Sequence, residues 1–422
     1  MCAKAAIFYF SIIPHDSLFA RHQQLYREWR SNFSEKHEFY YVNPPRRIVH
    51  FPKLLLRELE HSVKKLLSRQ TSERDAHILT AWLHLLYFPY TVSLLSLAVP
   101  RQISENPRLL KLFRFFLRRL LDKRTNITQK RIAIVSSPFW EPLITGNTFD
   151  LICYDCVDDL EAVSTPDTYD LARRRHQELI TKSDLIFVTA EKLKEDVLSI
   201  AHNKDIVVVS NGVDAEFFES AKKSHVTMSY VKKGRKAVGY IGFFGWFDFD
   251  LIFATANILT DVDFVLIGPV KGQAANYIQN KPKNVFALGT KEYAQIPAYI
   301  DLLDVCLIPF RQGPIIEATD PIKLYEYFSL GKPVVATHLR PLERFNDGHL
   351  LKLAGTPDEF VAAIRFFLMH DTNAWQASRR QVALQNSWRS KASLIMSSIE
   401  SHLNASKAET NTRNVSARVD SR

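Results

Sequence analysis

Short apolar runs alternate with amphipathic helical stretches along most of this sequence, and this alternation constrains the fold more than any other feature. The first series consists of AAIFYFSII, FYYVNPP, RIAIVSS, DLICYDC, DLIFVTA and DIVVVSN. Helical stretches near residues 168–182 and 191–202 separate the last three runs. A strand, a helix and a second strand in succession form a βαβ unit, whose strands are parallel. The series therefore predicts a parallel sheet with helices on both faces.

The alternation stops once, at NGVDAEFFESAKKSHVTMSYVKKGRK, which is rich in turn residues and charges. It resumes with AVGYIGFFG, DFVLIGP, NVFALG, VCLIPF and KPVVAT. We therefore expect an α/β chain of two Rossmann-like, doubly wound domains, residues 1–218 and 219–384. A helix at about 385–403 is expected to pack back on the first domain, and the polar residues 404–422 are expected to be disordered.

The net charge of +10 favours acidic partners such as nucleic acid, an anionic membrane or phosphorylated substrates. Nucleic acid is not expected as a partner, because the sequence contains no known nucleic-acid-binding motif. The four cysteines are too few for a disulfide framework and suit a reducing compartment. Cys153 and Cys156 are expected to be buried thiols, because a spacing of three in a strand sends two side chains to opposite faces.

The stretch DPIKLYEYFSLGKPVVAT, residues 320–337, reads as a helix followed directly by a buried strand. Asp320 suits the N-cap and Pro321 the first helical position, while Gly331 suits the residue past the end. We therefore expect the helix at about 321–330.

Two charged residues share one side of this expected helix near its start. The first turn of a helix carries unpaired amides and a partial positive charge, and Lys323 adds a full positive charge there. Glu326 lies three residues further on and can accept two hydrogen bonds from vicinal hydroxyls. The pair fits either a site for the diphosphate and ribose of a nucleotide or a surface ion pair.

PIKLYEYFSLGKPVVAT resembles the nucleotide-sugar motif of GT-B glycosyltransferases, especially those of the group-1, teichuronic-acid-type branch, and is more distantly similar to xanthan glucuronosyltransferase. Further motifs follow in the family's order: ARHQQLYREW, YDCVDDL, SDLIFVTAEKL, SNGVDAEFF, VGYIGFFGWFDFDLI, FVLIGP, VFALG and VCLIPF. The similarity covers about residues 7–344 apart from the loosely matching 47–131. It implies that the two domains face a cleft, with the acceptor on the first domain and the nucleotide sugar on the second.

The resemblance also assigns roles in binding the donor. Lys323 contacts the diphosphate, and we expect it to be catalytic by stabilising the leaving group. Glu326 contacts the ribose, and Asp320 belongs to the same site as the expected cap of the helix.

The loop 242–248 corresponds to the one that passes beneath the nucleotide in the family. Gly242 and Gly245 suit such a loop because bare backbone can approach a phosphate closely, although a tight turn would also need glycine. Arg311 follows the strand VCLIPF at its carboxyl end, where ligands bind in such sheets, so it is either a further phosphate contact or a solvated loop residue.

An inverting transfer needs a carboxylate that deprotonates the acceptor hydroxyl. YDCVDDL supplies Asp155, Asp158 and Asp159 at the end of a strand of the first domain. The base of the glucuronosyltransferase aligns with Asp158, whose pKa its neighbours would raise towards neutrality; helix capping is the alternative role. Most group-1 enzymes retain configuration and use no such base, so both mechanisms stay open.

Neither a cofactor nor a metal is expected. The sequence contains no G-x-G-x-x-G fingerprint and no G-x-x-x-x-G-K-[ST] loop. Asp261 and Asp263 imitate the metal-binding D-x-D of another glycosyltransferase fold, but they precede a strand and are expected to be turn residues. By the resemblance, a helix dipole and a lysine replace the metal in GT-B proteins.

RLLKLFRFFLRRLLDKR, residues 108–124, is apolar on one side and basic on the other. Lys111, Arg114 and Arg118 line up at helical spacing, and basic amphipathic helices bind anionic membrane surfaces. A helix that packs on a core and exposes a solvated basic side gives the same pattern. Residues 76–100 carry no charged side chain, but histidines and a proline interrupt them, so we expect a broken helix and loop rather than a membrane span.

Together these features predict a cytoplasmic glycosyltransferase that can associate with the inner face of the cytoplasmic membrane. We expect it to move a sugar from a nucleotide-diphosphate sugar to a lipid-linked or cell-envelope polysaccharide acceptor. The alternative is a catalytically silent GT-B subunit that acts as a membrane-surface partner; the intact Lys323 and Glu326 argue against it. The sugar, the nucleotide base and the acceptor depend on loop shape, which these motifs do not specify.

Overall fold

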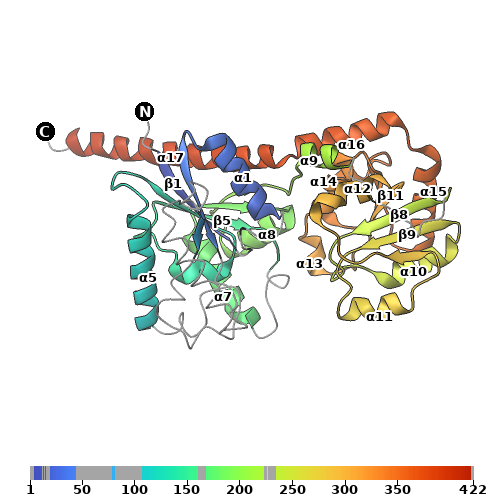
Figure 1. Ribbon diagram of the computed structural model, residues 1–422. Helices are drawn as coiled ribbons and strands as arrows, with labels where there is room; N and C mark the ends of the chain where they lie inside the picture. The colour runs from blue at the N-terminus through green and yellow to red at the C-terminus, as the bar shows by residue number, and fades with distance from the viewer. Residues whose placement is uncertain are drawn as a thin grey trace, which may run out of the picture. The chain divides into compact units, whose positions relative to one another are not determined.

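The computed structural model describes residues 4–11, 13, 15, 20–43, 78–80, 107–159, 168–222, 226 and 234–419. The chain divides into two compact units, each built around one sheet (Figure 1). Unit 1 contains the segments Met1–Val188, Leu193–Val209 and Ala392–Arg422. Unit 2 contains the segments Thr189–Lys192 and Ser210–Lys391.

The sheet of unit 1 is parallel throughout and has the strand order β3-β2-β1-β4-β5-β6-β7. Its strands are β1 (Ala5–Phe10), β2 (His37–Asn43), β3 (Ile78–Thr80), β4 (Arg131–Val135), β5 (Leu151–Cys156), β6 (Leu185–Val188) and β7 (Asp205–Val208). Every residue of β1, β5 and β6 is buried, as expected for parallel strands covered on both faces. Cys153 and Cys156 are buried free thiols of β5, as predicted.

The described helices of unit 1 include α1 (Arg21–Phe33), α5 (Pro107–Asp122), α7 (Tyr169–Lys182), most of α8 (Glu191–Ile200) and a 3₁₀ turn, η2 (Pro138–Leu143). Trp29 of α1 is fully buried, and its indole Nε1 donates a hydrogen bond to the carbonyl of Ala392 (3.2 Å). The N-terminal residues of α17 (Trp388–Val419) belong to unit 2, and those from Ala392 onward belong to unit 1.

The sheet of unit 2 is also parallel and has the order β10-β9-β8-β11-β12-β13. Its strands are β8 (Lys236–Ile241), β9 (Val262–Ile267), β10 (Val285–Ala287), β11 (Val305–Ile308), β12 (Val334–Ala336) and β13 (Leu351–Leu353). Its helices are α9 (Ala215–Ala221), α10 (Phe249–Ile258), α11 (Gln273–Gln279), α12 (Ile296–Asp301), α13 (Pro314–Glu317), α14 (Ile322–Ser329), α15 (Pro357–His370) and α16 (Asn373–Gln385).

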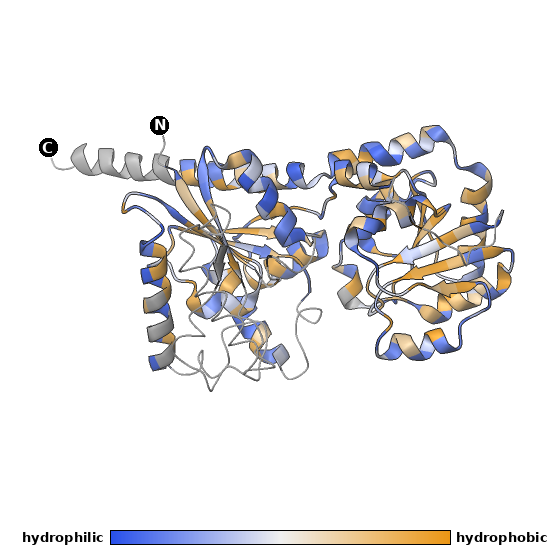
Figure 2. Ribbon diagram, in the orientation of Figure 1, coloured by the Kyte–Doolittle hydropathy of each residue, from blue (hydrophilic) through white to orange (hydrophobic). Residues whose placement is uncertain are grey.

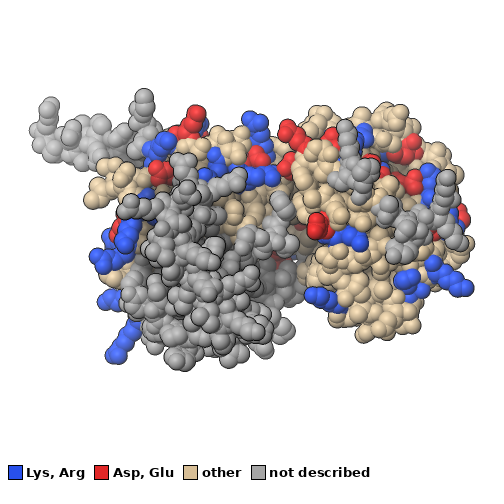
Figure 3. Space-filling model, viewed as in Figure 1, with Lys and Arg blue, Asp and Glu red and all other residues tan. Residues whose placement is uncertain are grey.

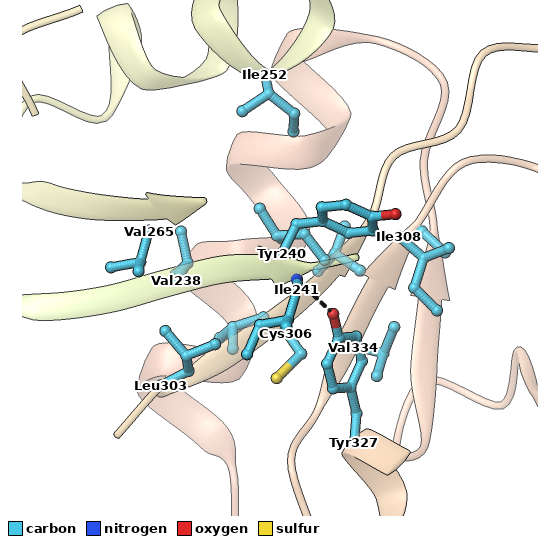
Figure 4. Packing of buried hydrophobic residues seen from close by; sticks show 14 of the residues in the cluster. Val238, Tyr240, Ile241, Ile252, Val265, Leu303, Cys306, Ile308, Tyr327 and Val334 are labelled. Atoms are coloured by element: carbon cyan, nitrogen blue, oxygen red, sulfur yellow. Dashed lines mark hydrogen bonds between the residues drawn. The ribbon is translucent and has the colours of Figure 1, made fainter. Parts of the chain in front are cut away.

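The core of unit 2 joins the apolar residues of these strands to the helices that cover them. Val238, Val265 and Val334 are fully buried, and each such side chain stabilises the fold by about 1.5–3 kcal/mol. Tyr327 of α14 points into the same core, where its hydroxyl accepts a hydrogen bond from the amide of Ile241 (3.0 Å; Figure 4). In Figure 2 the central strands are mostly hydrophobic, and hydrophilic residues lie on the surrounding helices. The hydrogen bond between Ile241 and Tyr327 holds α14 at the carboxyl end of β8.

Two observed boundaries differ from the expected ones. Unit 2 begins its main segment at Ser210 rather than after residue 218, because Phe218 of α9 is fully buried in the core of unit 2. Helix α17 continues to Val419, whereas residues 404–422 were expected to be disordered. No glycine or proline occurs between Trp388 and Val419, so no residue in this stretch ends the helix.

Among the described residues, none of the helices combines the length and the apolar character needed to cross a bilayer. Most of the charge-free stretch 76–100 lies outside the described residues, apart from strand β3.

Candidate functional site

Helix α14 begins one residue later than predicted, and Asp320 does not cap it. Pro321 occupies the N-cap position, and the carboxylate of Asp320 is buried instead. It accepts hydrogen bonds from the amide of Asn211 (2.6 Å) and the hydroxyl of Tyr325 (2.9 Å). Asp320 therefore ties the start of α14 to the segment before α9, and its pKa is raised mainly by burial.

Lys323 and Glu326 form an ion pair on the first turns of α14, with 2.8 Å between Nζ and Oε2. Glu326 is only 2% exposed, and its Oε1 accepts a longer hydrogen bond from the hydroxyl of Tyr293 (3.3 Å). A surface pair would expose both partners, whereas here a buried carboxylate is held by an ammonium and a phenol. The sequence pattern gave no indication of Tyr293, which lies 33 residues before Glu326.

Gly242 lies beside this pair. A Cβ atom added to it would stand 2.5 Å from Oη of Tyr240 and 3.3 Å from Cε of Lys323. Its carbonyl is also closely packed, because a Cβ on Gly268 would lie 2.0 Å from it. Glycine at 242 and 268 therefore lets the loop after β8 lie directly against the next strand end and beside the ammonium. Gly268 was not among the predicted site residues.

Gly245 and Arg311 are joined by a hydrogen bond from Nη2 of Arg311 to the carbonyl of Gly245 (2.7 Å). The amide of Arg311 also donates to the carbonyl of Trp246 (2.8 Å), so Arg311 fixes the loop after β8. The atoms nearest to a Cβ on Gly245 would all belong to the ring of Phe243, which is 64% exposed. The geometry makes glycine at 245 less necessary than glycine at 242.

The start of α14 is thus suited to hold an anion. The first amides of the helix point away from its hydrogen-bonded interior, and the helix dipole adds partial positive charge. Lys323 supplies a full charge, and the bare backbone of Gly242 lies close to its side chain. Glu326 supplies carboxylate oxygens one turn further along.

Asp155 is a structural residue rather than a free base. Its carboxylate is fully buried and receives two hydrogen bonds from the guanidinium of Arg21, at 2.8 and 3.2 Å. The hydroxyl of Tyr9 donates a third at 2.9 Å. This network joins β1, the start of α1 and the end of β5.

Asp158 follows the end of β5 and is exposed to solvent. It lines a pocket of unit 1, so protein atoms surround it on several sides although solvent reaches it. These protein atoms displace water from the carboxylate, and this loss of hydration is the main reason why the pKa of Asp158 is raised to about 6. The positive charge of Arg21 lowers this pKa, whereas the negative charges of Asp159 and Asp155 raise it further. A carboxylate with such a pKa can accept a proton near neutral pH.

The basic helix predicted at 108–124 is α5, and its three predicted membrane contacts differ in their surroundings. Lys111 and Arg118 are exposed. Arg114 is half-buried, and its Nε donates a hydrogen bond to the carbonyl of Pro142 (2.7 Å). Arg114 therefore fastens α5 to η2, and the exposed basic side of the helix is carried by its other cations (Figure 3).

Both aspartates of the D-x-D sequence form ion pairs with arginines of the same unit. Asp261 receives two hydrogen bonds from the guanidinium of Arg365, and Asp263 receives one from Nε of Arg235 (2.7 Å). Asp263 lies within β9 and not in a turn as expected. In the described parts of the chain, the structure contains no cluster of three or more His, Cys, Asp or Glu residues suited to a metal ion.

Residues 236–370, which lie in unit 2, match the family Glycosyl transferases group 1. The putative teichuronic acid biosynthesis glycosyltransferase TuaH of Bacillus subtilis (strain 168) is 27% identical over 266 residues. That match covers 58% of this chain and 66% of TuaH, just under two thirds of the relative's length.

Solved structures share the fold along almost the whole chain. Sucrose-phosphate synthase from Thermosynechococcus elongatus has a TM-score of 0.63 at 13% identity, covering 96% of this chain and 100% of that one. Anabaena Alr3699/HepE in complex with UDP-glucose has a TM-score of 0.60 at 13% identity, covering 94% of this chain and 99% of that one. These findings confirm the predicted GT-B fold and the predicted similarity to group-1, teichuronic-acid-type glycosyltransferases.

Proposed function

We propose that this chain, a GT-B protein whose unit 2 carries a domain of group 1 glycosyl transferases, moves a sugar from a nucleotide-diphosphate sugar to an acceptor hydroxyl. The single observation that carries the proposal is the start of α14. There a lysine and a buried glutamate lie together beside a glycine whose bare backbone closely approaches the lysine side chain.

Unit 2 binds the donor in this proposal. The diphosphate lies at the amides of α14 and at Lys323, and both neutralise the charge that develops as the diphosphate leaves. Glu326 accepts hydrogen bonds from the ribose hydroxyls. Asp320 supports the site indirectly, through its bonds to Asn211 and Tyr325. Gly245 and Arg311 shape the loop that covers the phosphates, and UDP-glucose in the complex of the similar Alr3699/HepE supports a nucleotide-sugar donor.

Unit 1 binds the acceptor, and Asp158 acts on it if the reaction inverts configuration. Asp158 then takes the proton of the acceptor hydroxyl while that oxygen bonds to the anomeric carbon and the bond to the diphosphate breaks. Its raised pKa supports this role. A retaining reaction would use no protein base, so the activity of Asp158→Asn decides between the two mechanisms.

The acceptor is a lipid-linked or cell-envelope polysaccharide in this proposal. The similarity to TuaH, named for teichuronic acid biosynthesis, supports a polysaccharide product. The exposed Lys111 and Arg118 of α5 support docking on an anionic membrane, where a lipid-linked acceptor would lie. No metal or cofactor takes part.

A thermal-shift screen of UDP-, GDP- and dTDP-sugars tests the donor site. The correct donor raises the melting temperature of the wild-type protein. Lys323→Ala removes a charge-assisted contact to phosphate, worth about 1.5–3 kcal/mol, and weakens donor binding roughly ten- to hundredfold.

Lys332→Ala is the matched control, because Lys332 lies in the same unit, just beyond the other end of α14, and pairs with Asp301. It leaves donor binding unchanged. Equal binding by wild type and Lys323→Ala would refute the proposed donor site, and no stabilisation by any nucleotide sugar would refute the proposed function.

A further inference from the structure

A groove in unit 1 is lined by residues of α7, of α8 and of the end of β5. Its volume is about 230 Å³, below the roughly 300 Å³ at which pockets for drug-sized ligands begin. It therefore has room for a group the size of one sugar ring. The lining residues are Cys156, Asp158, Asp159, Tyr169, Arg173, His176, Gln177, Leu193, Asp196, Val197, Ser199 and Ile200.

The groove presents both hydrogen-bond acceptors and donors at its surface. Asp158, just after β5, and Asp196 of α8 offer carboxylate oxygens. The exposed Arg173 and Gln177 of α7 offer N–H groups. Tyr169 adds an aromatic ring at the start of α7. A sugar ring has hydroxyls that both donate and accept, so a mixed lining of this kind satisfies it better than an all-donor or all-acceptor lining.

The charges of the lining are unbalanced. Among the lining residues there are three carboxylates, those of Asp158, Asp159 and Asp196, and one guanidinium, that of Arg173. The nearby Arg21 also acts on Asp158, but its charge is paired with the buried carboxylate of Asp155. His176 adds no positive charge at neutral pH, because burial lowers its pKa to about 4, and its Nδ1 is engaged by the hydroxyl of Tyr154 (2.9 Å). A ligand carboxylate or phosphate placed here would meet an excess of negative charge, which costs binding free energy.

We propose that this groove is the subsite for the acceptor sugar and that it selects an uncharged sugar over an anionic one. The inference rests on the proposed function, because it places the reacting hydroxyl beside Asp158 at the β5 end of the groove. It adds the substrate class: a neutral glycosyl residue carries the hydroxyl that receives the sugar. Any anionic part of the acceptor, such as a lipid phosphate, lies outside the groove.

The test compares two probes that differ only at C6, methyl β-glucoside with a hydroxymethyl group there and methyl β-glucuronide with a carboxylate. Saturation-transfer-difference NMR on the full-length protein at pH 7.5 measures the affinity of each. We expect the wild-type protein to favour the glucoside by about tenfold or more, which corresponds to 1.4 kcal/mol. Stronger or equal binding of the glucuronide, or no binding of either probe, would overturn the inference.

Two variants locate the binding and test the charge argument. Gln177→Arg adds a cation on the exposed side of α7 and should reduce the ratio of the affinity for the glucoside to the affinity for the glucuronide. Arg173→Ala should weaken binding of the glucoside through loss of its N–H donors. Thermal unfolding of each variant confirms that it is folded. Unchanged affinities for both probes in both folded variants would show that the sugar binds elsewhere, and the groove assignment would fail.

Stabilisation by nucleotide sugars, measured on the same samples, separates this inference from the proposed function. A protein that a nucleotide sugar stabilises but that lacks glucoside selectivity keeps the proposed function and loses the subsite. A protein that binds the glucoside but no nucleotide sugar loses the proposed function, and the groove then stands only as a sugar-binding site.

Discussion

At the scale of single residues, burial distinguishes the groups that build the structure from those left available for chemistry. Asp155 is fully buried and paired with Arg21, whereas Asp158, three residues later, is exposed and has a raised pKa. Glu326 is buried yet paired with an ammonium that remains partly accessible. Asp155 and Asp158, which are only three residues apart, therefore have different roles.

The two loop glycines should respond differently to substitution. In Gly242→Ala, the new Cβ would overlap Oη of the buried Tyr240 and press on Lys323, so we expect a loss of about 1–3 kcal/mol of stability and weaker donor binding. In Gly245→Ala, the exposed ring of Phe243 can rotate away, so the change should stay within about 0.5 kcal/mol. Thermal unfolding without the nucleotide sugar measures the stability of each variant, and unfolding with it measures donor binding. Equal effects at the two positions would contradict the close packing at Gly242.

The raised pKa of Asp158 predicts a pH dependence of the reaction. If the reaction inverts configuration, the carboxylate must be ionised to act as a base, so kcat/KM should fall as the pH drops below about 6 and level off above it. Asp159→Asn removes a neighbouring negative charge and should move this limb to lower pH. A kcat/KM that keeps its pH limb in Asp158→Asn would exclude Asp158 as its source.

The same pKa predicts an effect on stability. A carboxyl whose folded pKa lies above its unfolded value favours the fold at low pH, and that contribution is lost as the pH rises through about 6. Asp158→Asn should therefore be at least as stable as the wild type at pH 7.5, with less advantage at pH 5. Chemical denaturation at the two pH values measures this difference. A variant that is less stable at pH 7.5 would indicate a structural role, such as capping.

At the scale of elements, two helices combine apolar packing with exposed charge in different ways. Helix α14 has Leu324, Tyr325, Tyr327 and Phe328 fully buried, and it keeps Lys323 partly exposed at its start. Helix α5 buries Leu117 and Leu121, exposes Phe115 by 51% and carries cations over its outer side. The burial of α14 fixes one charge in place, whereas α5 presents many charges along its length.

The exposed basic side of α5 predicts binding to anionic vesicles. Lys111→Glu with Arg118→Glu should weaken flotation with phosphatidylserine-containing liposomes by at least about tenfold, because each basic residue near such a surface contributes about 1 kcal/mol. The matched control, Lys36→Glu with Lys130→Glu, changes the charge of unit 1 by the same amount outside α5. Equal flotation of the two double variants would show that α5 is not the membrane contact.

At the scale of the whole molecule, the chain returns to unit 1 after completing unit 2. The residues of α17 from Ala392 onward belong to unit 1, where Ala392, Ile395, Met396 and Ile399 are fully buried. Unit 1 is therefore built from segments at both ends of the sequence, and its core is complete only when the last helix has been made.

Truncations of α17 test this dependence. A chain that ends at residue 391 loses three large apolar side chains from unit 1, each worth about 2–5 kcal/mol, against a typical domain stability of about 5–15 kcal/mol. We expect unit 1 to lose its cooperative thermal transition, while unit 2 keeps its own core. A chain that ends at residue 405 retains these buried residues and should melt as the full-length protein does. Loss of the transition only in the shorter chain would support the assignment of α17 from Ala392 onward to the core of unit 1. Equal melting of the two chains would contradict that assignment.

Local sequence patterns determined the features that depend on neighbours in the chain. The alternation of apolar runs and helical stretches specified two parallel sheets, because strand and helix periodicities are set over a few residues. The spacing of Lys323 and Glu326 placed them on one side of a helix for the same reason. The raised pKa of Asp158 was also foreseeable in part, since one contributing acid, Asp159, is adjacent in sequence.

Only the tertiary structure decided which of these residues are buried and what they contact. Asp320 bonds to Asn211, 109 residues away, and so does not cap its helix. Asp155 is bound by Arg21 across 134 residues, and Arg114 is held by the carbonyl of Pro142. Such contacts depend on how the elements pack, and packing brings together residues whose separation in the chain carries no local signal.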